Sequence, residues 1–196
     1  MTRYLACAVA LLVCPACSQD TSPATSLTGP TSTSPTLLTP STTRSVSSRP
    51  VPLNYRAHLS GDEVVPPRET LAQGEAIMQI SPDRTEISYR VIASNVENAT
   101  GAHIHHAAAG SVGPLVALLV FPPLPPDGGR TDGVLATGTI TAAHLIGPFT
   151  GQPLSVLIDA IEAGNAYVDV PTNDGVFPPG TGSGDFPGGE IRGQLR

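Results

Sequence analysis

The stretch Ala102-His103-Ile104-His105 decides how the middle of this chain folds, and the apolar run Gly113-Pro114-Leu115-Val116-Ala117-Leu118-Leu119-Val120 follows it closely. Side chains at positions i and i+2 of an extended chain point to the same face. The two histidines therefore share one face of the predicted strand, and the isoleucine between them turns to the core. The second run continues to residue 121 and is apolar on both faces, which favours a strand in the interior of a sheet.

Alternation of apolar and polar residues continues along most of the chain after residue 52 and predicts further strands. With the two stretches above, the expected strands cover residues 55–59, 74–80, 86–94, 102–106, 115–121, 133–140, 166–170 and 190–195. Two short helices are expected at 142–146 and 153–161, the second with apolar residues at helical spacing. This pattern predicts an all-β fold, an antiparallel Greek-key-like β-sandwich with one or two short helices.

The beginning of the chain has the layout of an export signal of the lipoprotein type, predicted to cover residues 1–16. Arg3 precedes an apolar stretch at 4–13, and small residues follow before Cys17. The segment Val13-Cys14-Pro15-Ala16-Cys17 resembles a bacterial lipobox, although Cys14 and Pro15 depart from the usual pattern. The resemblance implies that Cys17 carries lipid. Simple cleavage after Ala16, which leaves Cys17 as a free thiol, is the alternative.

Residues 17–52 are dominated by serine, threonine and proline, and such a composition does not bury enough apolar surface to fold. We expect a disordered tether there, which would hold the domain at 53–196 away from a membrane or wall. All three cysteines precede residue 18, so the domain forms no internal disulfide. An exported domain of this kind depends on its core for stability.

The composition excludes several classes of function. The chain has 10 basic residues, all arginine, against 16 carboxylates and a formal net charge of −6, which makes a nucleic-acid partner unfavourable. Without lysine, Schiff-base chemistry is excluded. No serine lies in a nucleophile elbow, and no glycine-rich loop has the spacing that cradles phosphate. We therefore expect a protein that is not an enzyme and that has no cofactor.

Four segments, in this order, resemble the CHRD domain, a module named after the developmental protein chordin. They are Leu59-Ser60-Gly61-Asp62-Glu63-Val64-Val65-Pro66-Pro67, Ala102-His103-Ile104-His105 with Gly110, Gly113 and Pro114, Gly164-Asn165-Ala166-Tyr167-Val168, and Gly189-Glu190-Ile191-Arg192-Gly193-Gln194. The resemblance covers nearly the whole domain. It implies a β-sandwich found in secreted and surface proteins, without an established reaction.

His103 and His105 are the candidate metal ligands, because two imidazoles on one strand face can hold an ion between them. The family commonly has Tyr-Val-Asn-Val-His-Thr where this chain reads Tyr167-Val168-Asp169-Val170-Pro171-Thr172, so the natural third histidine is absent. Two ligands bind a metal loosely. A carboxylate could complete the set, and the candidates are Asp169, Asp174, Asp185 and Glu190. The metal would then be copper or zinc.

Glu190 and Arg192 lie two residues apart on the last strand, and this spacing predicts a charge pair that fixes the strand. The sequence as a whole favours an exported, lipid-anchored module of the cell envelope, with an unknown protein or cell-wall partner. Two alternatives remain open. One is a metal-binding or superoxide-dismutase-like redox protein that uses the His-x-His strand. The other is a calcium-stabilised adhesion domain with acidic ligands near the loop at 172–189.

Overall fold

The computed structural model describes residues 53–120, 124 and 128–196. Its strands are β1 (Asn54–Ser60), β2 (Gln73–Ile80), β3 (Ile87–Glu97), β4 (His103–His106), β5 (Leu115–Leu118), β6 (Arg130–Ile140), β7 (Ala166–Val170) and β8 (Ile191–Gln194). They form one antiparallel sheet in the order β5-β4-β7-β8-β1-β2-β3-β6. The predicted signal peptide, Cys17 and the tether lie outside the described residues.

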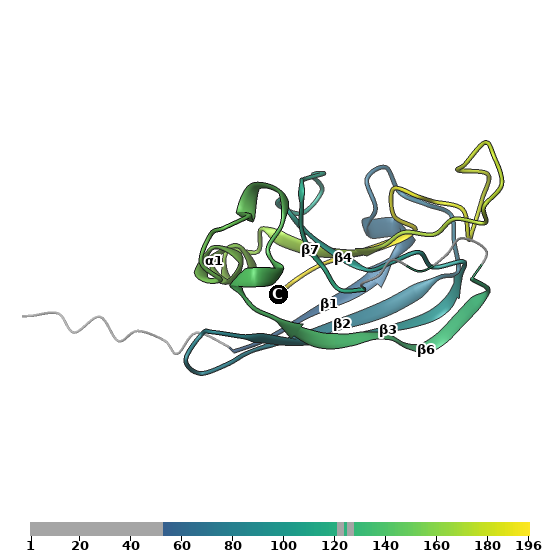
Figure 1. Cartoon of the computed structure of the whole chain (residues 1–196). Helices are drawn as coiled ribbons and strands as arrows, with labels where there is room; N and C mark the ends of the chain where they lie inside the picture. Colours follow the sequence, from purple (N-terminus) through teal and green to yellow (C-terminus); the bar gives the residue numbers. More distant parts are fainter. Residues whose placement is uncertain (1–52, 121–123, 125–127) are drawn as a thin grey trace, which may run out of the picture. The chain divides into compact units, whose positions relative to one another are not determined.

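The sheet folds over on itself into two layers, with the crossing at β8 and β1. Between these two strands, Ser60 and Arg192 form a β-ladder pair. The contact continues at Arg56 and Arg196, whose backbones form two reciprocal hydrogen bonds of 2.9 Å. Strands β1, β2, β3 and β6 make the lower layer in Figure 1, and β4 and β7 lie in the upper one. Because β6 returns to pair with β3 after β4 and β5, the connection is Greek-key-like. The predicted all-β class is confirmed.

The core lies between the layers and is built by strand alternation, as the sequence predicts. In β1, for example, the side chains of Tyr55, Ala57 and Leu59 are buried while their neighbours are exposed. The largest fully buried apolar residues are Leu59, Met78, Ile80, Ile87, Ile104, Ile140, Leu157, Ile158, Ile161, Ile191 and Leu195. Burial of such side chains contributes about 1.5–3 kcal/mol each, so a core of this size stabilises the domain without disulfides.

Helix α1 (Ser155–Glu162) lies at one end of the layers and confirms the second predicted helix (Figure 1). Its apolar side chains Leu157, Ile158 and Ile161 are buried, as the helical spacing requires. The first predicted helix is shorter than expected, because the chain makes only a 3-10 turn over Ala142–His144. The backbone N–H of Thr141 donates to Nδ1 of His144 across this turn.

The position predicted for the apolar run after His106 is wrong, because β5 is an edge strand and not an interior one. Its free side is covered by the segment that follows β6. Ala117 forms a bridge with Leu145, and the N–H of Ile146 donates to the carbonyl of Val116 at 2.9 Å. This contact pairs the free edge of the strand. Val116 and Ala117, which point to opposite faces, are both buried, and this fits a sequence that is apolar on both faces.

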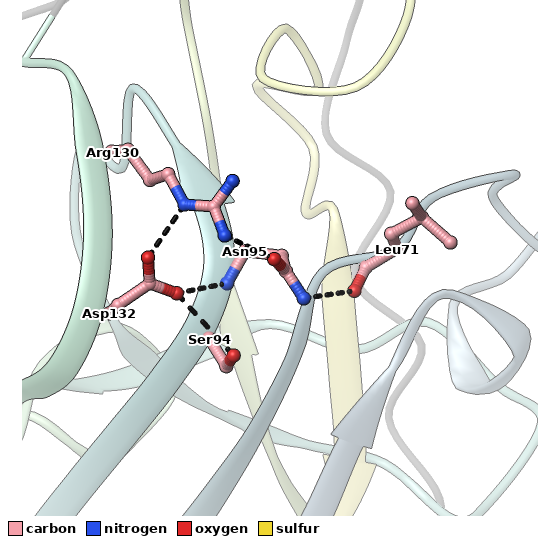
Figure 2. Close-up of polar contacts among 5 residues, drawn as sticks. All are labelled: Leu71, Ser94, Asn95, Arg130 and Asp132. Carbon is pink, nitrogen blue, oxygen red and sulfur yellow. Dashed lines mark hydrogen bonds and ion pairs between the residues drawn. The ribbon is translucent and has the colours of Figure 1, made fainter.

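A β-bulge interrupts the pairing of β3 with β6 between Ala93 and Val96, and Figure 2 shows what stabilises it. Asn95 has a positive φ of 56°, and its N–H donates to Asp132 Oδ1 at 2.8 Å. Arg130 donates to the other oxygen of Asp132 and to the side chain of Asn95. The side-chain Nδ2 of Asn95 donates to the carbonyl of Leu71. This hydrogen bond attaches the loop after β1 to the bulge.

Helix α1 offers a direct test of this core. We expect Leu157→Ala to lower the free energy of unfolding by about 2–5 kcal/mol, because it leaves a cavity where the side chain is fully buried. Chemical denaturation followed by circular dichroism measures the loss. Asp159→Ala, on the exposed side of the same helix, serves as the matched control and should leave the midpoint unchanged. Equal effects of the two substitutions would contradict the packing described.

Candidate functional site

The antiparallel pairing of β4 with β7 brings the candidate ligands together. His103 lies opposite Asp169 in this register, and His105 lies opposite Tyr167. The side chain of Ile104 is fully buried in the core, so both histidines lie on the outer face of the upper layer. The prediction that His103 and His105 share one face is confirmed.

Asp169 is the carboxylate that joins the two imidazoles. Its Oδ1 lies 3.5 Å from Nδ1 of His103 and 3.4 Å from Nε2 of His105. Possible ligand atoms of the three residues all lie within 4.8 Å of one another. Among the residues that the structure describes, no other group of three histidines, cysteines or carboxylates meets this condition.

Loops cover this outer face and bury polar side chains on it. Asp169 is only 7% exposed, and the side chains of His103 and His105 are 22% and 17% exposed. Gln194 and Arg192 on β8 donate to the carbonyls of Ala107 and Ala108, which attaches the loop between β4 and β5. The histidines are therefore partly enclosed, and are not on an open solvent face.

Two groups hold the ring of His105, and Arg192 in turn packs on one of them. Its Nδ1 lies 2.9 Å from the carbonyl oxygen of Gly113. The ring stacks on Tyr167 with centroids 5.0 Å apart and planes 11° from parallel. Arg192 is on β8, which pairs with β7 on the side opposite to β4. Its guanidinium lies 3.6 Å from the centre of the Tyr167 ring. Because a carbonyl only accepts, Nδ1 of His105 carries a hydrogen and donates it to Gly113.

His103 has its position because residue 101 is glycine. A Cβ built on Gly101 would lie 2.9 Å from Nε2 of His103, closer than real contacts allow. A side chain at this position would displace the imidazole. The glycine thus leaves room for His103 to turn its other nitrogen, Nδ1, toward Asp169.

The charges of the cluster support one another. Burial alone would raise the pKa of the Asp169 carboxyl, but His103 and His105 outweigh it and hold this pKa below its usual value. Burial opposes the charged form of His105 too, and the neighbouring Asp169 carboxylate raises the pKa of His105 above its usual value. The Asp169 carboxyl is therefore ionised, and its negative charge favours a positive charge beside it, which either a proton on His105 or a bound cation can supply.

The predicted ion pair between Glu190 and Arg192 is wrong. Both side chains are buried, but no salt bridge joins them within the described part of the chain. Arg192 lies over Tyr167, on the outer face. Glu190 precedes β8 and its carboxylate is taken by hydroxyl and backbone donors.

Four donors satisfy the Glu190 carboxylate, which is 0% exposed. Thr172 donates to Oε2 at 2.8 Å, the N–H of Gly184 donates to Oε2 at 2.8 Å, and Ser183 donates to Oε1 at 2.7 Å. Thr70 donates to Oε1 as well. These donors come from the loop after β1 and the loop at 171–190, so one carboxylate connects both loops. Sequence reasoning missed the hydroxyl partners, because they are up to 120 residues away from Glu190.

The other carboxylates considered as ligands are used inside the loop after β7. Asp174 accepts from the N–H of Val176 at 2.8 Å, and Asp185 accepts from the N–H and hydroxyl of Thr181 at 3.0 Å. These contacts stabilise local turns. They bring no set of oxygens together for calcium, so the calcium alternative receives no support among the described residues.

A hollow of about 470 Å³ lies beside the bulge whose residues Figure 2 shows. On its wall, Asn95, Arg130 and Ser183 are already paired with other residues, while the carboxylates of Glu69 and Glu97 also line it. Among the described residues, however, three possible metal ligands come together at the histidine cluster and not in this hollow. The histidine cluster is therefore the stronger candidate metal site.

Comparison with known proteins agrees with the four segments noted in the sequence. The profile of the family described as CHRD domain matches residues 55–195. The chain belongs to the CHRD-domain family. No curated protein and no solved structure matches the chain. The CHRD domain includes the histidine cluster and Glu190, and its described residues contain no helix that is long and apolar enough to cross a membrane.

The role assigned to Glu190 in the CHRD domain predicts a large effect of a small change. Glu190→Gln replaces one acceptor oxygen with an N–H₂ group that faces hydroxyl and backbone donors. We expect it to lower the free energy of unfolding by on the order of 3 kcal/mol, because buried donors lose their partner. Denaturant melts measure this, with the exposed Glu86→Gln as control. If the free energy of unfolding of Glu190→Gln equalled that of the Glu86→Gln control, the assignment would be contradicted.

Proposed function

We propose that this chain is an exported CHRD-domain protein, lipid-anchored through Cys17, that acts as a binding or structural module of the cell envelope. It would perform no reaction of its own. The family match over residues 55–195 supports the module, and the lipobox-like segment at 13–17 supports the anchor. The Ser/Thr/Pro-rich residues between them would give the module reach from the membrane.

The loop between β7 and β8, residues 171–190, is the observation that best supports a binding role. The buried Glu190 carboxylate fixes the base of this loop to Thr172, Ser183 and Gly184. Away from the base, Val176 is 64% exposed and Phe177 is 89% exposed. A loop that is fixed at its base and presents apolar side chains to solvent is suited to contact a protein or cell-wall partner.

We expect Phe177→Ser to weaken the binding of the protein to isolated cell-envelope material several-fold, because it removes the most exposed large apolar side chain of this loop. The assay is cosedimentation of the full chain, with Cys17→Ser so that lipid does not itself retain the protein. Val134→Ser, which removes an exposed apolar side chain from β6, is the matched control.

Two results would contradict this binding role. In one, the Phe177→Ser and Val134→Ser variants bind to the same extent as the parent protein. In the other, the parent protein does not sediment with the envelope at all. Melting curves of the variants establish that each is folded.

Lipidation is tested separately. In a bacterial host fed radioactive palmitate, we expect the wild-type chain to become labelled and to fractionate with membranes, since the proposed lipid is attached at Cys17. Cys17→Ser should lose the label and appear in the soluble extracytoplasmic fraction, whereas Cys14→Ser should behave as wild type. An unlabelled wild-type chain would contradict the anchor but not the binding role.

A superoxide-dismutase-like enzyme is not favoured. The chain matches the CHRD family, and its cluster combines two imidazoles with one carboxylate rather than the larger histidine set of those enzymes. We therefore propose no redox reaction.

A further inference from the structure

We propose that His103, His105 and Asp169 together bind one divalent transition-metal ion, zinc or copper. The ligand atoms would be Nδ1 of His103, Nε2 of His105 and Oδ1 of Asp169. This inference goes beyond the binding role proposed above and does not depend on the lipid anchor. It concerns the outer face of β4 and β7 and uses none of the hydrogen bonds of the Glu190 carboxylate.

The first argument is that two facing atoms in the cluster have no partner. His105 Nε2 and Asp169 Oδ1 are both buried, and neither makes a hydrogen bond. They face each other at 3.4 Å, beyond the usual range of an N–H···O bond. Buried polar atoms in native proteins are almost always paired, so these two call for a missing partner.

The tautomer of His105 indicates that the missing partner is a cation. Since Nδ1 of His105 donates to the carbonyl of Gly113, the neutral ring presents a lone pair at Nε2. That lone pair is directed at a carboxylate oxygen, so two acceptors face each other. A metal ion between them would accept electron pairs from both. The competing solution is a second proton on His105, which gives an ion pair without metal.

The distances suit a metal ion. Zinc has bonds of about 2.0–2.1 Å to imidazole nitrogen and carboxylate oxygen, so two ligands on a tetrahedral ion lie about 3.3–3.4 Å apart. The two separations from Asp169 Oδ1 are 3.5 Å and 3.4 Å. Two of the three separations thus already match those around a tetrahedral ion, and the third, between the two imidazoles, is within 4.8 Å. A direct hydrogen bond from His105 to Asp169 would require the atoms to move closer.

The groups around His103 and His105 orient the two imidazoles, as the neighbours of metal-bound histidines usually do. The second nitrogen of a metal-bound histidine typically donates to a carbonyl or carboxylate, and His105 does this with Gly113. Stacking on Tyr167 fixes its ring plane. Gly101 leaves the space that His103 needs. Preorganisation of this kind raises affinity, because less conformational entropy is lost on binding.

The ligand types select the metal. Imidazole suits zinc and copper, whereas calcium and magnesium prefer sets made of oxygen. No thiolate lies in the domain, since the three cysteines all precede residue 18. Three protein ligands leave one tetrahedral position for water. With His103 22% exposed, the ion would reach the site from solvent and exchange with it.

The test uses the full chain with serine in place of Cys7, Cys14 and Cys17, so that no thiol competes for metal. Isothermal titrations with Zn²⁺ and with Cu²⁺, and visible absorption with Co²⁺ as a spectroscopic probe, measure binding. We expect one equivalent of metal to bind, with tetrahedral cobalt bands. His103→Ala and Asp169→Asn should each weaken binding at least tenfold, and Ca²⁺ should not compete.

The matched control is His106→Ala. His106 is on the same strand, but its ring packs near Phe149 with centroids 5.1 Å apart, away from the cluster. Its substitution should leave affinity unchanged. Since Asp169 is buried, circular dichroism must show that each variant is folded, and should Asp169→Asn unfold, the more exposed His103→Ala decides.

Two results would overturn the proposal. One is a folded parent protein that binds neither Zn²⁺ nor Cu²⁺ at one equivalent, which would leave the protonated ion pair as the explanation. The other is binding that His103→Ala weakens no more than His106→Ala does. Neither result would affect envelope binding through Phe177, so failures of the two proposals are distinguishable.

Discussion

The register of β4 against β7 is the constraint on which the site depends. It places His103 opposite Asp169 and puts the two histidines outside while Ile104 enters the core. A shift by one residue would turn both imidazoles inward and leave Ile104 exposed. The apolar core therefore fixes the polar cluster. The pattern that folds the protein also assembles the candidate ligands.

The outer face of this sheet carries more buried polar groups than an open sandwich face does. Asp169, Arg192 and Gln194 are all buried there, under loops that their own hydrogen bonds hold in place. Glu190 performs a similar role for the loops after β1 and β7. In many small exported domains, disulfides fix the long loops. This domain has no cysteine, and its long loops are fixed by these buried polar contacts instead.

Much of the fold could be predicted from the sequence, because strand alternation and helical spacing are local signals. The run 154–161 marks its helix by spacing alone, and Tyr55 to Leu59 marks its strand. The edge position of β5 could not be predicted. Its two apolar faces are typical of an interior strand, and only the tertiary structure shows that the segment at Leu145 covers it.

The candidate site was predictable in part. The i, i+2 spacing alone places His103 and His105 on one face, whereas the choice of Asp169 among four carboxylates depends on how β7 pairs with β4. The same spacing misled for Glu190 and Arg192, where it predicted an ion pair. The hydroxyls of Thr70, Thr172 and Ser183 bind the carboxylate instead. Contacts between distant loops leave no periodic signal in the sequence.

The most direct measurement of the central claim is a long-range ¹H–¹⁵N correlation spectrum of the histidine rings, recorded before and after addition of one equivalent of Zn²⁺. The account predicts that the metal-free His105 is protonated at Nδ1. It further predicts that zinc shifts Nε2 of His105 and Nδ1 of His103, with the rings of His58, His106 and His144 unchanged. A spectrum in which zinc moves no ring nitrogen, or moves those of His106 instead, would contradict it.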